Sequence, residues 1–386
     1  MNSFAGRREF IKGAVAMVAV ARWRAWAGEN GLPEYYGEHL AKVEAKVRAL
    51  MKSCAGGFFF ITDPHVKSNH CKSGLLIAEL IRRTGLDLVL CGGDIVEAFG
   101  AGYPADKDAV DFAIDRFTSL WVKPVRAVGG RMYSAKGNHD FTVRHSMRPE
   151  DGNKGFTYSG AEARKIIIDG WTERDIVTNE SDPNGCYYYL DDAKAKIRYI
   201  VADTTDSETA GNTGWGVHYG IHSVQLKWLA GVALKTVPQG FGVVVMHHIP
   251  TTTVVGNDGD RSRFAEFRGL LEAYQRRGRF AADGVEYVFS DARGEILVDL
   301  TGHHHAERQT FQNGVLHITE PCDAAYKDYV YGSTPWCGSL PEKKRGTVSE
   351  QTLDEKALMW KIWPRATALS KVLSDRKKGD CGDEGE

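Results

Sequence analysis

The sequence lacks any strong excess of charge of one sign. Lys and Arg together number 49, Asp and Glu number 50, and the formal net charge of the 386 residues is −1. A chain this close to neutrality has no overall electrostatic attraction for nucleic acid or for an anionic membrane. We therefore expect any recognition of phosphate by this protein to be local. No internal repeat is apparent in the sequence.

The sequence also lacks a cysteine pattern typical of metal binding. Its seven cysteines include no CxxC pair, and their number is odd. If the protein is exported, Cys322 and Cys337 are the most plausible pair to be oxidised, because both lie in a late loop region. Cys91 lies within an apolar run, and we expect it in the core. The sequence settles no disulfide.

The N-terminus lacks an apolar run long enough to span a bilayer, which needs about 20 residues. Arg7-Arg8 instead precede Phe10-Ile11, the uncharged stretch 13–21 and the cleavage-like Ala25-Trp26-Ala27. This order resembles a bacterial twin-arginine (Tat) export signal; the alternative is a basic disordered N-terminus. The resemblance predicts a signal peptide over residues 1–27 and a periplasmic or secreted protein. Because no cysteine lies near Gly28, we expect no stable membrane anchor after cleavage.

Strands and helices alternate in the first half of the chain. Apolar residues recur every three or four positions over 37–51, which predicts an amphipathic helix. The apolar stretches 58–61, 86–91 and 131–135 predict buried strands, and helical patterns over 75–83 and 105–121 lie between them. This βαβαβ order favours an α/β protein with a parallel sheet and right-handed crossovers.

The second half predicts a hairpin, from Tyr187–Leu190 and Ile197–Val201, and then further strands and helices. The strands are expected at 242–246, 295–300 and 315–319, and the helices at 222–233 and 261–277. We therefore divide the mature chain into an N-terminal helical segment (28–54), one large domain (55–325) and a C-terminal extension (326–386). The end of the extension is charged and contains glycine, so we expect it to be partly disordered.

Side chains that can bind metal follow these predicted strands directly. They are Asp63 and His65, Asp94, Asn138, His247, and His303 with His305. Ligands of open α/β sheets bind at the carboxyl ends of the strands, which is where these residues fall. In extended backbone, two residues separated by one lie on the same side, so Asp63 with His65, and His303 with His305, can each face one place. His304 is expected to point the other way.

The donor set contains carboxylates, an amide oxygen and imidazoles, but no thiolate. It suits Zn²⁺, Mn²⁺ or iron, divalent or of mixed valence, rather than a thiolate-bound structural zinc. The candidate ligands are too many for one tetrahedral ion. With one carboxylate bridging, they fit two ions roughly 3.5–4 Å apart.

These stretches, in this order, resemble the motif set of the calcineurin-like metallophosphoesterases: D-x-H, G-D, G-N-H-D/E, an apolar strand ending in His, and G-H-x-H. The resemblance covers roughly residues 55–325 and implies a four-layer α/β/β/α sandwich with a dinuclear metal site. Carried over by position, it implies the following ligands: Asp63, His65 and His305 for one ion, Asn138, His247 and His303 for the other, and Asp94 as the bridge.

The resemblance also implies a catalytic role for His139, which is not a ligand in the family. His139 lies beside Asn138, where it suits a hydrogen bond to the phosphoryl oxygen or protonation of the leaving group. Asp140 or Glu97 is a candidate to orient His139. We expect His248 outside the ligand set.

The expected activity is metal-dependent hydrolysis of a small-molecule phosphate ester by a metal-bridging hydroxide. Monoesters and diesters remain alternatives, because the shared metal core handles both. Arg144, His145 and Arg148 either contact the substrate phosphate or form a solvated basic loop. The rival functions are a non-catalytic metal- or ligand-binding protein on the same fold and a nuclease. The neutral charge and the export signal argue against the nuclease.

Overall fold

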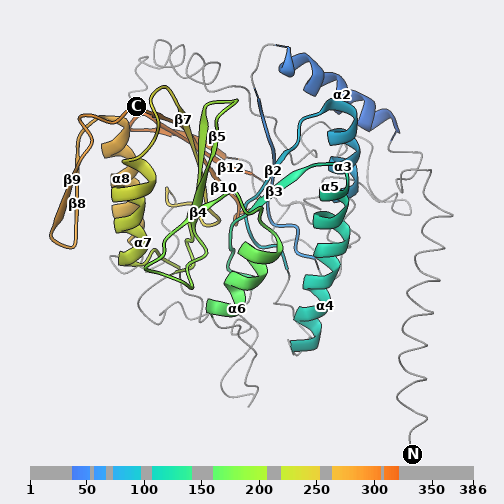
Figure 1. Cartoon of the computed structure of the whole chain (residues 1–386), viewed down its shortest axis with the longest axis horizontal. Coiled ribbons are helices and arrows are strands. Elements are labelled where there is room, and N and C mark those ends of the chain that lie inside the picture. The colour runs from blue at the N-terminus through green and yellow to red at the C-terminus, as the bar shows by residue number, and fades with distance from the viewer. Residues whose placement is uncertain are drawn as a thin grey trace, which may run out of the picture.

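The computed structural model describes residues 37–52, 56–66, 73–96, 107–140, 160–206, 219–252, 263–305 and 308–320 (Figure 1). Several predictions concern residues outside these ranges: the signal peptide, Glu97, Arg144, His145 and Arg148, the pair Cys322 and Cys337, and the C-terminal extension. Among the described residues, no helix is both long enough and apolar enough to cross a membrane.

The first sheet forms from the βαβαβ part of the sequence. Strands β1 (Phe59–Ile61), β2 (Leu88–Cys91) and β3 (Arg131–Ser134) lie parallel and in chain order, which confirms the predicted parallel sheet. Every residue of β1 and β2 is buried, as expected of strands with continuous apolar sequence. The helical elements of this half are α2 (Gly37–Met51), α3 (Ser73–Thr84), α4 (Lys107–Phe117), the π-helical segment η2 (Thr118–Val122) and α5 (Lys123–Ala127).

The second sheet has seven strands in the order β11-β12-β10-β7-β6-β5-β4. Their bounds are β4 (Val177–Thr178), β5 (Tyr188–Asp192), β6 (Ile197–Val201), β7 (Gly242–Met246), β10 (Glu295–Thr301), β11 (Arg308–Gln312) and β12 (Val315–Thr319). The central strands β6, β7, β10 and β12 are parallel, and β4, β5 and β11 pair antiparallel at the edges. The antiparallel pairing of β5 with β6 confirms the predicted hairpin.

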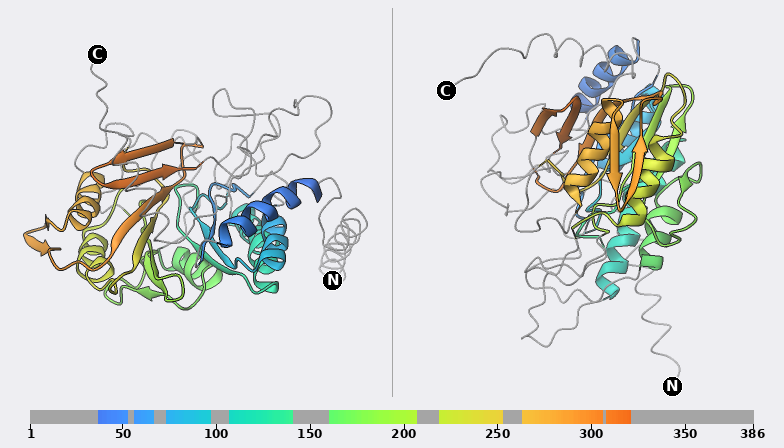
Figure 2. Two further views of the ribbon diagram at one scale, coloured as in Figure 1. Left: turned by 90° about the horizontal axis from the view of Figure 1, so that it is seen from above. Right: turned by 90° about the vertical axis from the view of Figure 1, so that its left-hand side faces the viewer.

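Some of the remaining elements pack into the core beside the first sheet, and the others pack on the second sheet. They are α6 (Gly160–Arg164), η5 (Lys165–Gly170), α7 (Ser223–Trp228), η6 (Leu229–Leu234), α8 (Phe264–Gln275) and the separate hairpin of β8 (Arg279–Ala282) and β9 (Val285–Val288). Figure 1 shows helices α3, α4 and α5 on one side of the molecule and α7 and α8 on the other, with the two larger sheets between them and the β8–β9 hairpin outside α8. Figure 2 shows the same arrangement from above.

Strand β7 shows why the second sheet is covered on both faces. Its residues are all buried. Val244 and Met246 belong to a core cluster shared with β1, β2, β3 and α3, whereas Val243 and Val245 belong to a second cluster shared with α7 and α8. Successive side chains of a strand point to opposite faces, so one face of β7 packs toward the first sheet and the other toward the helices. The predicted mixed α/β class is confirmed.

Candidate metal centre

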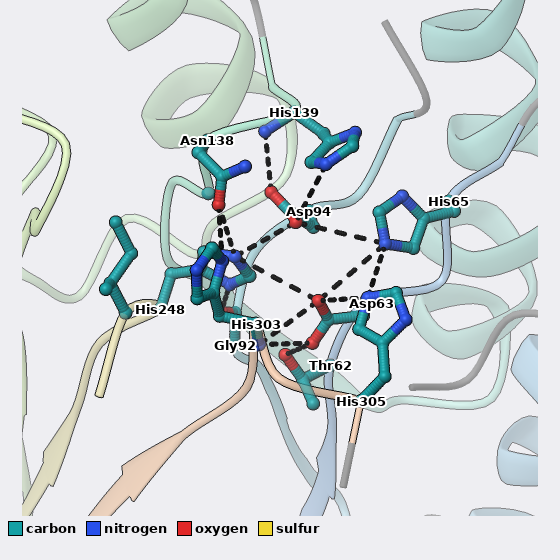
Figure 3. Close-up of polar contacts among 12 residues, drawn as sticks. Thr62, Asp63, His65, Gly92, Asp94, Asn138, His139, His248, His303 and His305 are labelled. Carbon is teal, nitrogen blue, oxygen red and sulfur yellow. Dashed lines mark hydrogen bonds and ion pairs between the residues drawn. The ribbon is translucent and has the colours of Figure 1, made fainter. Parts of the chain in front are cut away.

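Polar side chains from five strand ends meet at one place between the two sheets (Figure 3). Asp63 and His65 follow β1, Asp94 follows β2, and Asn138 and His139 follow β3. From the second sheet, His248 follows β7, and His303 and His305 follow β10. These residues form three overlapping groups, and within each group the donor atoms lie within 4.8 Å of one another. The groups are Asp63, His65 and His305; His65, Asp94 and His139; and Asp94, His248 and His303.

The backbone at this place is left-handed rather than extended. The φ angles are 54° at Asp63, 43° at His65, 50° at Asp94, 71° at His303 and 52° at His305. The sequence-based reason for the convergence of the pairs, extended backbone, is therefore wrong, although both pairs do reach the same place. Positive φ in residues other than glycine is uncommon and concentrates at functional sites, at a cost on the order of 1–3 kcal/mol each.

The first group of donors is formed by Asp63, His65 and His305. His65 Nε2 lies 3.1 Å from His305 Nε2, and His305 Nε2 lies 3.2 Å from Asp63 Oδ1. Burial alone would raise the pKa of Asp63, but His248, His305 and His65 lower it well below its ordinary value. An ionised carboxylate and two imidazole nitrogens that face one point are a donor set that suits a divalent ion.

The second group of donors is formed around Asn138. Its Oδ1 lies 2.7 Å from His303 Nδ1 and 3.0 Å from His248 Nε2. Burial and the neighbouring His248 lower the pKa of His303 to about 3, so its ring is in the neutral form that binds a metal. His248 Nδ1 donates a hydrogen bond to the backbone oxygen of Gly92 at 2.9 Å, which turns Nε2 toward Asn138.

Asp94 lies between the two groups. Its Oδ2 is 3.0 Å from His248 Nε2 and 3.8 Å from His65 Nε2, so it can reach both sides of the centre. Burial alone would raise the pKa of Asp94, but His248 and His139 lower it well below its ordinary value. Burial lowers the pKa of His248, but Asp94 and Asp63 raise it to about 9, so a metal ion at Nε2 would replace a proton.

The structure does not bring His247 to this centre. Its Nδ1 donates a hydrogen bond to the Ile249 carbonyl at 3.0 Å, and its Nε2 lies 2.8 Å from Asp299 Oδ1. The expectation that His247 faces the centre, with His248 outside it, is therefore wrong, and His248 takes that place. The alternation of β7 contains the signal: Val244 and Met246 face the first sheet, and two residues further on the same side comes His248.

Asp140, which had no firm role from sequence, ties the centre together. Its Oδ1 accepts hydrogen bonds from the backbone N–H groups of Ile95 and Val96, at 2.7 and 2.9 Å, and its Oδ2 accepts one from Gly137 N–H at 2.8 Å. Burial and the nearby Asp94 raise the pKa of Asp140 to about 7 against the effect of these hydrogen bonds. Asp140 thus joins the loop after β2 to the loop after β3.

Two glycines allow the loops to approach the carboxylates. A Cβ atom at Gly137 would overlap the backbone nitrogen and Oδ1 of Asp94, and one at Gly302 would overlap Oδ2 of Asp63. Gly137 therefore lies closer to Asp94 than a residue with a side chain could. His139 N–H donates to Asp94 Oδ1 at 2.7 Å across this narrow gap. His304 packs its ring against His303, with the ring centroids 5.1 Å apart, and belongs to none of the three groups.

Comparison with known proteins agrees with this geometry. A model of the calcineurin-like phosphoesterase family matches residues 57–307, which is more than half of the chain. The chain therefore belongs to the calcineurin-like phosphoesterases. It is a hydrolase that acts on phosphate esters and depends on metal, and membership of the family implies a dinuclear centre and a small-molecule phosphate ester as substrate. No curated protein matches the chain.

Solved structures show more distant similarity. A dimetal phosphatase from Danio rerio is 15% identical with a TM-score of 0.45, and the match covers 70% of this chain and 88% of that one. A phosphopantetheinyl hydrolase from Mycobacterium tuberculosis is 12% identical with a TM-score of 0.30, and the match covers 69% of this chain and 90% of that one.

The hydrogen bonds of Asp140 generate a test of the centre's framework. We expect Asp140→Asn to lower the free energy of unfolding by about 1–3 kcal/mol, because an amide N–H would face the Gly137 N–H in place of an acceptor. Activity should also fall, since Gly137 packs directly on Asp94. Urea denaturation and initial rates measure both effects. Asp87→Asn, which changes a half-exposed partner of Arg131, is the control and should cost less than about 1 kcal/mol. Equal behaviour of the two variants would contradict the role of Asp140.

Proposed function

We propose that this protein hydrolyses a small-molecule phosphate ester at a centre of two metal ions. One ion would be held by Asp63, His65 and His305, the other by Asn138, His248 and His303, and Asp94 would bridge them. The observation that carries the proposal is the convergence of these donors from separate strands of both sheets. Nitrogen and oxygen donors without a thiolate favour Mn²⁺, Zn²⁺ or iron.

When bound, such ions supply Lewis acidity, which neutralises charge on phosphoryl oxygens and makes hydroxide available near neutral pH. The chain's own residues hold the reacting groups in place. Asp63 and Asp94 are buried and ionised, so they provide the fixed negative charge that retains two cations. Gly137 and Asp140 keep Asp94 at the meeting point of the two donor groups.

His139 is proposed as the residue that acts on the substrate. Its side chain is 18% exposed, whereas those of Asp63, His65 and Asp94 are almost fully buried, so it lies at the more open edge of the centre. Its ring packs edge-to-face on His65 with centroids 4.8 Å apart. From this edge, an imidazole N–H can donate to a phosphoryl oxygen or protonate the leaving oxygen.

Metal content tests the centre directly. In saturating Mn²⁺ followed by desalting, we expect two ions per wild-type chain by elemental analysis. His248→Gln should lose one ion, because only His248 faces Asn138 and Asp94. His247→Gln keeps every donor and should retain more of that ion than His248→Gln does. Fewer than two ions in the folded wild type would sink the dinuclear proposal. Loss of an ion from the His247 variant alone would restore His247 as the ligand.

Matched aryl phosphate substrates decide which ester is cleaved. Comparison of kcat/KM for a phosphate monoester and a phosphate diester with the same leaving group, each with Mn²⁺ and Zn²⁺, separates the two alternatives that the motifs leave open. Turnover of single-stranded or duplex DNA, with neither aryl ester cleaved, would favour a nuclease. A chain that binds two ions but cleaves none of these substrates would favour a non-catalytic binding protein.

Replacement of His139 tests its role in proton transfer. We expect His139→Ala to lower kcat by about 10²–10⁴-fold, because general acid catalysis is worth about that much. KM and metal content should change little, since the donors assigned to the ions remain. An unchanged kcat would leave His139 a structural residue. Loss of an ion would make it a ligand instead, as its proximity to His65 and Asp94 also permits.

We also propose that the protein is exported by the twin-arginine pathway to the periplasm or beyond. The support is the order of Arg7-Arg8, Phe10-Ile11 and Ala25-Trp26-Ala27 in the sequence. Expression of the full chain in a bacterium, followed by fractionation, should place a shortened product in the periplasm. The double variant Arg7→Lys, Arg8→Lys should remain in the cytoplasm at full length. Equal export of both proteins would exclude this pathway.

A further inference from the structure

A chain of buried polar residues lies directly behind the metal centre. It consists of His247 after β7, Asp299 on β10 and His317 on β12, which are 0%, 1% and 6% exposed. His247 Nε2 lies 2.8 Å from Asp299 Oδ1, and His317 Nδ1 lies 2.7 Å from Asp299 Oδ2. One carboxylate thus contacts two imidazoles from different strands, His317 by a hydrogen bond and His247 at ion-pair distance. None of these residues belongs to the donor groups of the centre.

The position of Asp299 is fixed by the sheet itself. Asp299 pairs with His317 in the parallel register of β10 and β12, so the two side chains are neighbours on one face. Burial alone would raise the pKa of Asp299, but His247 and His317 lower it well below its ordinary value, and the carboxyl is ionised. An ionised carboxylate in the interior is tolerated only when it is paired, so Asp299 restrains both rings.

His247 transmits this restraint to the centre. Its Nδ1 binds the Ile249 carbonyl at 3.0 Å, and the Ile249 N–H donates to Thr204 Oγ1 at 2.9 Å. Phe267 also packs edge-to-face on His247, with the ring centroids 5.2 Å apart. His248 lies between these two anchored residues, and its own ring is held at the other nitrogen by Gly92 O. The direction of His248 Nε2 therefore depends on where His247 is held.

We propose that Asp299 is a positioning residue for the metal centre. It holds His247, His317 holds Asp299, and the turn from His247 to Ile249 consequently presents His248 to Asn138 and Asp94. This inference rests on the proposed function, because it treats His248 as a ligand. In this proposal the His247 ring fixes the position of the turn that carries His248. The residues that support the centre then include Asp299 on β10 and His317 on β12, which do not face the ions.

The test is a comparison of two Asp→Asn variants in the same sheet. Asp299→Asn keeps the shape of the side chain and removes its charge. Asp191→Asn does the same to the partner of the buried Arg198, at the end of β6 distant from the centre. Mn²⁺ affinity is measured by calorimetric titration of the full metal-free chain. The surroundings of bound Mn²⁺ are followed by electron paramagnetic resonance, and stability is measured by thermal unfolding.

We expect Asp299→Asn to weaken the binding of one of the two ions about 10–100-fold, the usual effect of removing a residue that orients a ligand. The Mn²⁺ spectrum should change, and Asp191→Asn should leave both affinities and the spectrum as in the wild type. If Asp299→Asn binds both ions like the wild type, or if both variants weaken binding equally, Asp299 does not position the centre.

Variants at His317 decide the matter if Asp299→Asn does not fold. His317→Leu removes the hydrogen bond to Asp299 and should weaken one ion about three- to tenfold, as expected for the loss of one hydrogen bond. His317→Asn places an amide N–H near the position of Nδ1 and should restore the affinity. Wild-type affinity in His317→Leu would overturn the proposal. A wild type without two ions would overturn the proposed function itself, which keeps the two failures distinct.

Discussion

The structure depends on two carboxylates buried close together, Asp63 and Asp94, which are 0% and 1% exposed. Like charges in an interior repel each other and lose their hydration, so they persist only beside positive charge. Among the neighbours, His248 lowers the pKa of each carboxyl most strongly. Two buried carboxylates beside imidazole nitrogens are also what a pair of cations requires. At His248 Nε2, a proton and a metal ion would compete for the same nitrogen. The loops around the carboxylates follow from this requirement.

The surrounding chain accepts local strain to keep these charges in position. Left-handed backbone at Asp63, His65, Asp94, His303 and His305 turns side chains from three separate loops toward one point. Such conformations persist because the strands that precede them are buried in two hydrophobic clusters. Asp140 and Asp299 then fix loops from opposite sides, one through backbone N–H groups and one through a pair of imidazoles. The centre is thus supported from both sheets.

Much of the fold could be predicted because the core strands are continuous apolar runs. The helix at Gly37–Met51 and the strand at Gly242–Met246 have the predicted bounds. The exposed hairpin of β8 and β9 and the edge strand β11 escaped prediction. These strands are only four or five residues long and most of their residues are not buried, so they present no continuous apolar run. Prediction from motifs also failed for His247 and His248. The two residues are adjacent and identical, so they differ only in the face of the sheet toward which each side chain points.

The order of residues along the chain already shows which residue types follow the strands, and hence the family and the class of chemistry. Motif order and donor type are properties of the linear chain, and they required no coordinates. The folded chain shows that His248 faces the centre while His247 turns to Asp299, and that Asp140 joins two loops. Strand alternation assigns the two histidines to opposite faces, but the partners that each face meets come from distant strands.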